Sequence, residues 1–154
     1  METKTHCVIN ELLVDIFNDI LVIEQRVLRN GQFSDVSITE THTIEAIGTD
    51  EPKSMGEVAK ILEITVGTLT IAINNLVKKG YVERVRSEED RRVVNISLTQ
   101  KGKLLYEFHK KFHSDMVKET ATGISKEEEK VLINSLEKLN EFFKEKLKVI
   151  SMQN

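Results

Sequence analysis

The chain has 154 residues, of which 40% are hydrophobic and 31% are charged, and it contains one cysteine. This length suits one globular domain with its own core, a single cysteine excludes an intramolecular disulfide framework, and no apolar run reaches the ~18 residues of a membrane span. The start of the chain lacks the basic and apolar segments of a signal peptide, so we expect a cytoplasmic protein without a membrane partner.

The net charge of −3 is unevenly distributed. Residues 78–103 carry eight basic against four acidic side chains, whereas residues 1–54 carry four basic against ten acidic ones. Charges farther apart than a Debye length of ~8 Å are screened at physiological salt, so a phosphate responds to the local charge. The basic stretch therefore fits a nucleic-acid partner, and it equally fits a solvated charged surface.

Apolar residues at helical spacing predict four helices in the first half of the chain. Ser37 and Ser54 each begin a capping box, and Gly80 follows the last of these helices as a stop signal. The third and fourth helices meet through a tight connection at residues 62–65. The four predicted helices cover residues 6–29, 37–48, 54–62 and 65–79.

Two β-rich segments follow, at residues 81–86 and 93–98, with a charged loop between them. Thr99 can cap a long helix that Gly123 ends, and Ser125 begins a third capping box that opens the last helix. The predicted order is α-α-α-α-β-β-α-α. The expected fold is mainly α with a small β-hairpin wing, in the α+β class.

The central segment has the pattern of a winged helix-turn-helix that binds duplex DNA. Thr side chains suit phosphates and thymine methyls, Asn can pair with adenine, and a glycine at the helix N-terminus admits a phosphate. Arginines in the hairpin loop suit a narrow minor groove, and we expect Asp90 to hold Arg91 extended. The predicted DNA-contacting residues are Thr65, Gly67, Thr68, Thr70, Ile71, Asn74, Asn75, Arg84, Arg86, Asp90, Arg91 and Arg92.

Residues 69–102 resemble the signature of the MarR family of winged-helix repressors. The shared pattern is L-x-x-K-G-x-x-x-R, then D-R-R in the wing, then a strand ending in L-T-x-x-G. Its positions here are Leu76, Lys79, Gly80, Arg84, Asp90, Arg91, Arg92, Leu98, Thr99 and Gly102. The resemblance implies a transcriptional repressor. This sequence departs from many relatives at Ile71, where those relatives have an arginine. Base recognition by this position must therefore differ.

The resemblance covers essentially the whole chain and implies a homodimer whose N- and C-terminal helices interlock. Residues 1–154 then form a single MarR-type domain. Its winged-helix DNA-binding part covers residues 36–100, and its helical dimerisation part covers residues 5–30 and 103–150. Such a dimer places two recognition helices one duplex turn apart, ~34 Å, on double-stranded DNA with a pseudo-palindromic operator.

Within the family, the sequence is similar to the branch that represses fatty-acid biosynthesis genes. The segments that carry this similarity include FNDILVIEQ, ITETHTIEAIG and FHKKFH. The branch implies a long-chain acyl group on acyl carrier protein as co-repressor, with no required cofactor and with unknown ligand-binding residues. A regulator of another small-molecule ligand remains an alternative.

The histidines offer a competing interpretation. His109 and His113 are four residues apart and share a helix face, and Glu24 and His42 belong to helices that pack near that face in this fold. Three histidines and a glutamate suit tetrahedral zinc, as in a zinc-responsive branch of the family. They also suit a buried hydrogen-bond network between the fifth and second helices, or a role in acyl gating. An enzyme is disfavoured, because the chain has no Gly-rich phosphate loop, nucleophile elbow or H-E-x-x-H motif.

Overall fold

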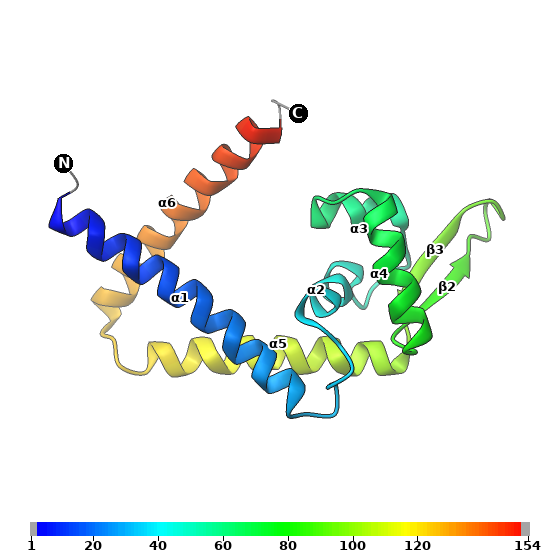
Figure 1. Cartoon of the computed structure of the whole chain (residues 1–154), viewed down its shortest axis with the longest axis horizontal. Coiled ribbons are helices and arrows are strands. Elements are labelled where there is room, and N and C mark those ends of the chain that lie inside the picture. The colour runs from blue at the N-terminus through cyan, green and yellow to red at the C-terminus, as the bar shows by residue number, and fades with distance from the viewer. Residues whose placement is uncertain (1–2, 152–154) are drawn as a thin grey trace. The chain divides into compact units, whose positions relative to one another are not determined.

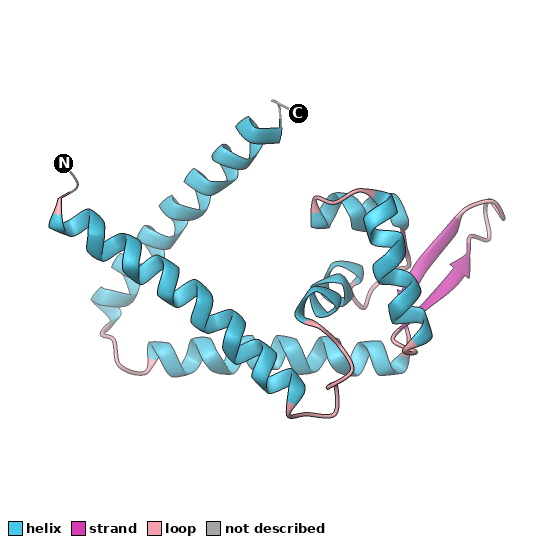
Figure 2. Ribbon diagram, viewed as in Figure 1, coloured by secondary structure: helices cyan, strands magenta, loops and turns pink. Residues whose placement is uncertain are grey.

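The computed structural model describes residues 3–151 and confirms a mainly helical winged helix (Figure 1). Strands occupy only a small part of the chain, as Figure 2 shows. The first two and last three residues of the predicted domain lie outside the described residues. The elements in chain order are α1 (Lys4–Arg29), α2 (Ile38–Ile47), β1 (Lys53–Ser54), α3 (Met55–Leu62), α4 (Val66–Lys78), β2 (Val82–Arg86), β3 (Val94–Leu98), α5 (Gln100–Ala121) and α6 (Lys126–Ser151).

The chain divides into two compact units, Met1–Lys110 and Lys111–Asn154, and the division falls within α5. The first unit holds α1 to β3 and the beginning of α5, so it contains the whole predicted winged-helix part. The second unit holds the rest of α5 and α6. Among the described helices, none combines the length and apolar character that crossing a membrane requires.

The sheet has one strand more than the sequence predicts. β1 pairs antiparallel with β3, which gives the strand order β1-β3-β2, with Lys53 opposite Ile96. In the hairpin itself, Val82 of β2 lies opposite Leu98 of β3. The predicted two-stranded wing was incomplete because β1 has only two residues, which are too few to form an alternating pattern.

Three helices begin at the capping boxes expected from the sequence. Ser37, Ser54 and Ser125 each accept a hydrogen bond from the backbone N–H three residues later. The glutamate at that later position accepts in turn from the serine's own N–H. Since each cap stabilises its helix by about 1 kcal/mol, these pairs define where α2, α3 and α6 begin.

The core of the first unit fixes α4 against its neighbours. Leu69, Ile73 and Leu76 on one face of α4 are fully buried. The face of α4 opposite these residues therefore points outward. The core also includes Leu28, Phe33, Val36, Ile44, Ile47, Val58, Ala59, Tyr81, Val82, Ile96, Leu98 and Leu105.

The start of α5 lies in very close contact with the start of β2. A Cβ atom on Gly102 would lie 2.1 Å from the carbonyl oxygen of Tyr81, a distance that no side chain could occupy. Thr99 joins the same elements, because its hydroxyl donates to the carbonyl of Gly80 at 2.6 Å and accepts from the N–H of Gly102. The predicted cap at Thr99 therefore also anchors the hairpin to α5.

Candidate nucleic-acid interface

The turn between α3 and α4 has the tight geometry of a helix-turn-helix. Glu63 ends α3 with a left-handed backbone (φ 55°), and the N–H of Ile64 donates to the carbonyl of Ala59 at 3.0 Å. Thr65 then caps α4, since its hydroxyl accepts from the N–H of Thr68 at 3.2 Å. The two threonine hydroxyls also share a hydrogen bond of 2.9 Å. These bonds position the first turn of α4 at the surface.

Half of the residues that the sequence predicts to contact DNA are exposed at the start or on the outward face of α4. Ile71 is 67% exposed, although it is aliphatic. Thr70 differs from its neighbours, because it is half-buried and its hydroxyl donates to the carbonyl of Val66 at 2.8 Å. The predicted residues that are exposed at the start or on the outward face of α4 are Thr65, Gly67, Thr68, Ile71, Asn74 and Asn75.

The loop between β2 and β3 forms a wing in which three arginines, including Arg86 at the end of β2, stand beside three acidic residues. Arg86, Arg91 and Arg92 are exposed, and a hollow of about 390 Å³ lies between Arg86, Ser87, Glu88 and Arg91. Two guanidinium groups and the acidic residue Glu88 border this hollow, and the two guanidinium groups suit an anionic partner.

Asp90 has a different role from the expected one. Its carboxylate accepts a hydrogen bond from the backbone N–H of Arg92 at 2.9 Å, and its carbonyl accepts from the N–H of Val93. No ion pair among the described residues joins Asp90 to Arg91. Asp90 therefore shapes the turn of the wing and forms no ion pair with Arg91 among the described residues.

Arg84 links the wing to α4. Its guanidinium donates a hydrogen bond to the amide oxygen of Asn74 at 2.5 Å, and both side chains are exposed. The sequence predicts each residue to contact DNA but gives no sign of their contact, because they lie ten positions apart on different elements.

A polar network holds the C-terminal end of α4. The Lys79 ammonium lies 2.8 Å from both carboxylate oxygens of Glu40, at the start of α2. Lys101 of α5 donates to the carbonyl of Lys79 at 2.9 Å and lies 4.0 Å from the centre of the Tyr81 ring. The Tyr81 hydroxyl donates to Asp35 at 2.6 Å, and burial together with this carboxylate raises the pKa of Tyr81. Of these residues only Lys79 belongs to the signature found in the sequence.

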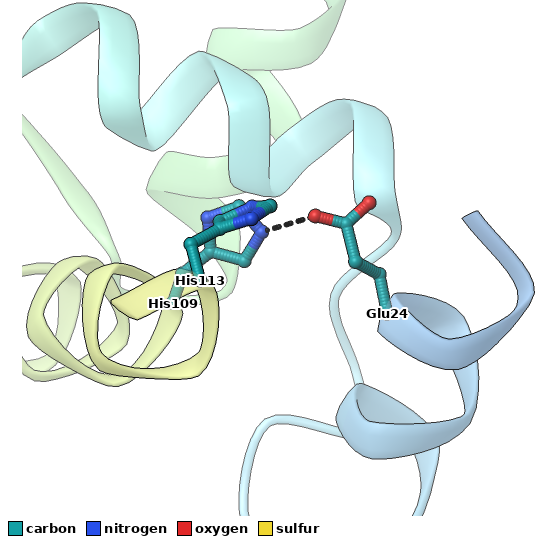
Figure 3. A group of neighbouring side chains, drawn as sticks. All are labelled: Glu24, His109 and His113. Carbon is teal, nitrogen blue, oxygen red and sulfur yellow. Dashed lines mark hydrogen bonds and ion pairs between the residues drawn. The ribbon is translucent and has the colours of Figure 1, made fainter. Parts of the chain in front are cut away.

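His109 forms the predicted hydrogen-bond network between the fifth and second helices. Its Nδ1 lies 2.7 Å from Glu45 of α2, and its Nε2 lies 2.9 Å from Glu24 of α1, the bond drawn in Figure 3. The ring of His42 lies edge-on to the ring of His109, with the two ring centres 5.9 Å apart. His113 follows His109 one turn later on α5. Burial opposes the charge of His109, but the carboxylates of Glu45 and then Glu24 outweigh it and raise the pKa.

In this network the ring nitrogens of His109, a proposed zinc ligand, already contact two carboxylates. Zinc binds a neutral imidazole nitrogen through its lone pair, whereas both ring nitrogens of His109 face carboxylates. A zinc ion would have to displace one of these carboxylates or bind through it. The four-residue set Glu24, His42, His109 and His113 remains a prediction.

Residues 34–93 match the model of the MarR family. The chain is 36% identical over 102 residues to the HTH-type transcriptional regulator SarZ of Staphylococcus haemolyticus (strain JCSC1435), covering 66% of this chain and 68% of SarZ. It is 35% identical over 78 residues to YpoP, an uncharacterized HTH-type transcriptional regulator of Bacillus subtilis (strain 168), covering 50% and 55%. The chain spans 49% to 63% of the length of the first curated relatives it matches.

Solved structures extend the similarity to nearly the whole chain. Streptococcus pneumoniae FabT, crystallised in complex with DNA, has a TM-score of 0.86 and 47% identity, covering 91% of this chain and 98% of that one. The S. aureus MepR–DNA complex, at 22% identity, has a TM-score of 0.68 and shares the fold over 86% of this chain and 96% of that one. Fold and interface thus define a winged helix-turn-helix protein. The chain belongs to the MarR family, whose members are transcription regulators and not enzymes.

Proposed function

We propose that the chain is a sequence-specific transcriptional regulator that binds double-stranded DNA as a repressor. The observation that carries this proposal is the combination, within one unit, of an outward polar face on α4 with an arginine wing. The exposed side chains of α4 suit a major groove, and the guanidinium groups of Arg86 and Arg91 suit the phosphates or minor groove beside it. In a protein that binds no DNA, nothing would favour an exposed isoleucine on the polar outward face of α4.

The proposed regulator acts as a homodimer on a pseudo-palindromic operator. On α1, Leu12 is 55% exposed and Phe17 is 64% exposed. On α6, Val131 is 67% exposed and Phe142 is 56% exposed. Large apolar side chains exposed in rows at helical spacing require a partner, and a second copy of the chain offers the same surfaces for mutual burial.

We further propose that the regulated genes serve fatty-acid biosynthesis, with long-chain acyl-acyl carrier protein as co-repressor. The support is the resemblance to that branch of the family and the 47% identity to FabT. The apolar residues of the helices suit an acyl chain, as do those of many helical proteins. The zinc-responsive alternative depends on the histidine cluster.

Titration of the purified chain against promoter duplexes tests both the sequence-specific DNA binding and the fatty-acid proposal. We expect affinity to fall steeply as salt rises, because phosphate contacts release counterions, and we expect selected promoters to bind more tightly than random duplexes. Long-chain acyl-acyl carrier protein should tighten operator binding, whereas the unacylated carrier should not. Equal affinity for all duplexes would contradict sequence-specific regulation. A response to zinc that a chelator reverses, without a response to the acylated carrier, would replace the fatty-acid proposal by the zinc alternative.

A further inference from the structure

Arg84 and Asn74 form a pair on the exposed surface between α4 and the hairpin. The guanidinium of Arg84, on β2, donates to the amide oxygen of Asn74, on α4. Asn74 lies one helical turn after Ile71 and shares its outward face. A base in contact with α4 at this position would therefore face atoms of both elements.

The chemistry of arginine determines how the amide of Asn74 is oriented. Arginine carries only donors, so the atom of Asn74 that it contacts must be the oxygen. The amide nitrogen and its two N–H donors then remain for an outside partner. The oxygen retains a second lone pair, but a positive charge already lies at hydrogen-bonding distance and disfavours a further donor. The pair thus offers donors and no readily used acceptor.

We propose that Arg84 makes Asn74 select guanine in place of adenine. A free asparagine recognises adenine by accepting from N6 and donating to N7. With its oxygen engaged, Asn74 can only donate, and Arg84 has further N–H groups beside it. Guanine presents two adjacent acceptors in the major groove, N7 and O6, whereas adenine presents one acceptor beside a donor. Arg84 is therefore a positioning residue for Asn74 and a second donor.

This inference rests on the proposed DNA-binding function and replaces the pairing with adenine that asparagine alone would suggest. Hydrogen bonding to a phosphate would also satisfy donors. Such a contact carries no base preference, so the preference itself distinguishes the two.

The test uses the full chain and a library of random duplexes. Selection with the wild type and with Asn74→Ala identifies the base pair at which Asn74 acts, because that position alone loses its preference. We expect guanine there. Competition binding then compares guanine with hypoxanthine, which keeps N7 and O6, with 2,6-diaminopurine, which replaces O6 by an amino group, and with 7-deazaguanine, which lacks N7. Hypoxanthine should bind within about twofold, and the other two should weaken binding about fivefold or more.

Two variants of Arg84 separate positioning from a structural role. Arg84→Met frees the amide oxygen and should move the preference at this base pair from guanine toward adenine. Arg84→Lys retains a side chain with donors only and should keep guanine. A purely structural role would weaken all duplexes by the same factor and leave the preference unchanged. Thermal melting checks that both variants fold.

Three outcomes would each overturn the inference. The wild type could select adenine, the preference for guanine could survive in Arg84→Met, or no position could prove sensitive to Asn74→Ala. In these cases a sequence is still selected, so the proposed function stands. If no sequence is enriched at all, the proposed function fails and the inference fails with it.

Discussion

Arg91 stands at the tip of the wing, exposed and bordering the same hollow as Arg86. Replacing it by alanine removes the proposed cationic contact to DNA without disturbing the core. We expect Arg91→Ala to weaken operator binding by about 1–3 kcal/mol and to lower the salt slope by about one if the contact is to phosphate. Gel-shift titration at several salt concentrations measures both. Unchanged affinity in Arg91→Ala would contradict the role of the wing.

Ile71 is an exposed aliphatic side chain on a face that is otherwise polar. Since thymine is the base with a methyl group in the major groove, we expect Ile71 to contact that methyl group. Replacing the contacted thymine by deoxyuridine should weaken wild-type binding by about 0.8 kcal/mol, the value of one buried methylene-sized group. In Ile71→Ala the same replacement should have little effect. A loss of equal size in both proteins would show that Ile71 does not contact the methyl group.

At the scale of residues, the sequence predicted which side chains face outward better than it predicted their partners. Helical periodicity separates Leu69, Ile73 and Leu76 from the exposed residues of α4, because a helix repeats every 3.6 residues. Periodicity contains no information about contacts between segments. The Asn74–Arg84 bond therefore became visible only in the structure, as did the hydrogen bond of Asp90 within the wing.

The packing of α5 against β2 depends on the small size of Gly102. In Gly102→Ala, a methyl group would lie 2.1 Å from the carbonyl oxygen of Tyr81. The backbone must therefore shift to make room for it. We expect this variant to lose about 1–3 kcal/mol of unfolding free energy. Urea unfolding followed by circular dichroism measures the loss. Gly56→Ala is the matched control, since nothing lies within 4 Å of its new Cβ atom and alanine favours a helix. Equal stability of the two variants would contradict the close approach.

Element boundaries followed the sequence wherever a side chain defines them locally. The predicted caps at Ser37, Ser54 and Ser125 begin α2, α3 and α6, because a capping box is a contact between residues three positions apart. β1 had no such local signal. Its two residues become a strand only because β3 lies beside them, and that pairing joins positions more than forty residues apart.

At the scale of the molecule, His109 joins three helices, since it lies on α5 and bonds to Glu24 of α1 and Glu45 of α2. The sequence anticipated a network between α5 and α2 but missed Glu45, because an acidic residue on a helix is normally solvated. The raised pKa of His109 means that the charged form stabilises the fold. That stabilisation is complete below the ordinary pKa of 6.5 and is lost as pH rises through the higher folded value.

His109→Gln should therefore destabilise the protein more at pH 6 than at pH 9. Each pH unit between the two pKa values changes the free energy of unfolding by about 1.4 kcal/mol. Urea unfolding of the wild type and the variant across this range gives the difference at each pH. A difference that is constant with pH would mean that the pKa of His109 is the same in the folded and the unfolded protein.

In the proposed function, operator recognition depends on the assembly of two chains into a dimer. Phe17 of α1 is 64% exposed and, in the proposed dimer, is buried by a second copy. We expect Phe17→Asp to dissociate the dimer, because a carboxylate cannot be buried there without a partner. Sedimentation should then give the mass of one chain, and helical content should be retained if the first unit keeps its core. Ile61→Asp is the matched control, since Ile61 is 55% exposed on α3, outside the predicted dimerisation part.

The same variant connects assembly with DNA binding. Two recognition helices joined in one dimer bind a pseudo-palindrome with an affinity that exceeds single-site binding by ~10²–10⁴-fold, because the second contact is intramolecular. Phe17→Asp should lose most of this factor on a full operator and almost nothing on a half-site. If the variant remains dimeric, α1 does not form the interface through this residue. If it is monomeric but binds the full operator as tightly as the wild type, the two half-sites are not recognised by one dimer.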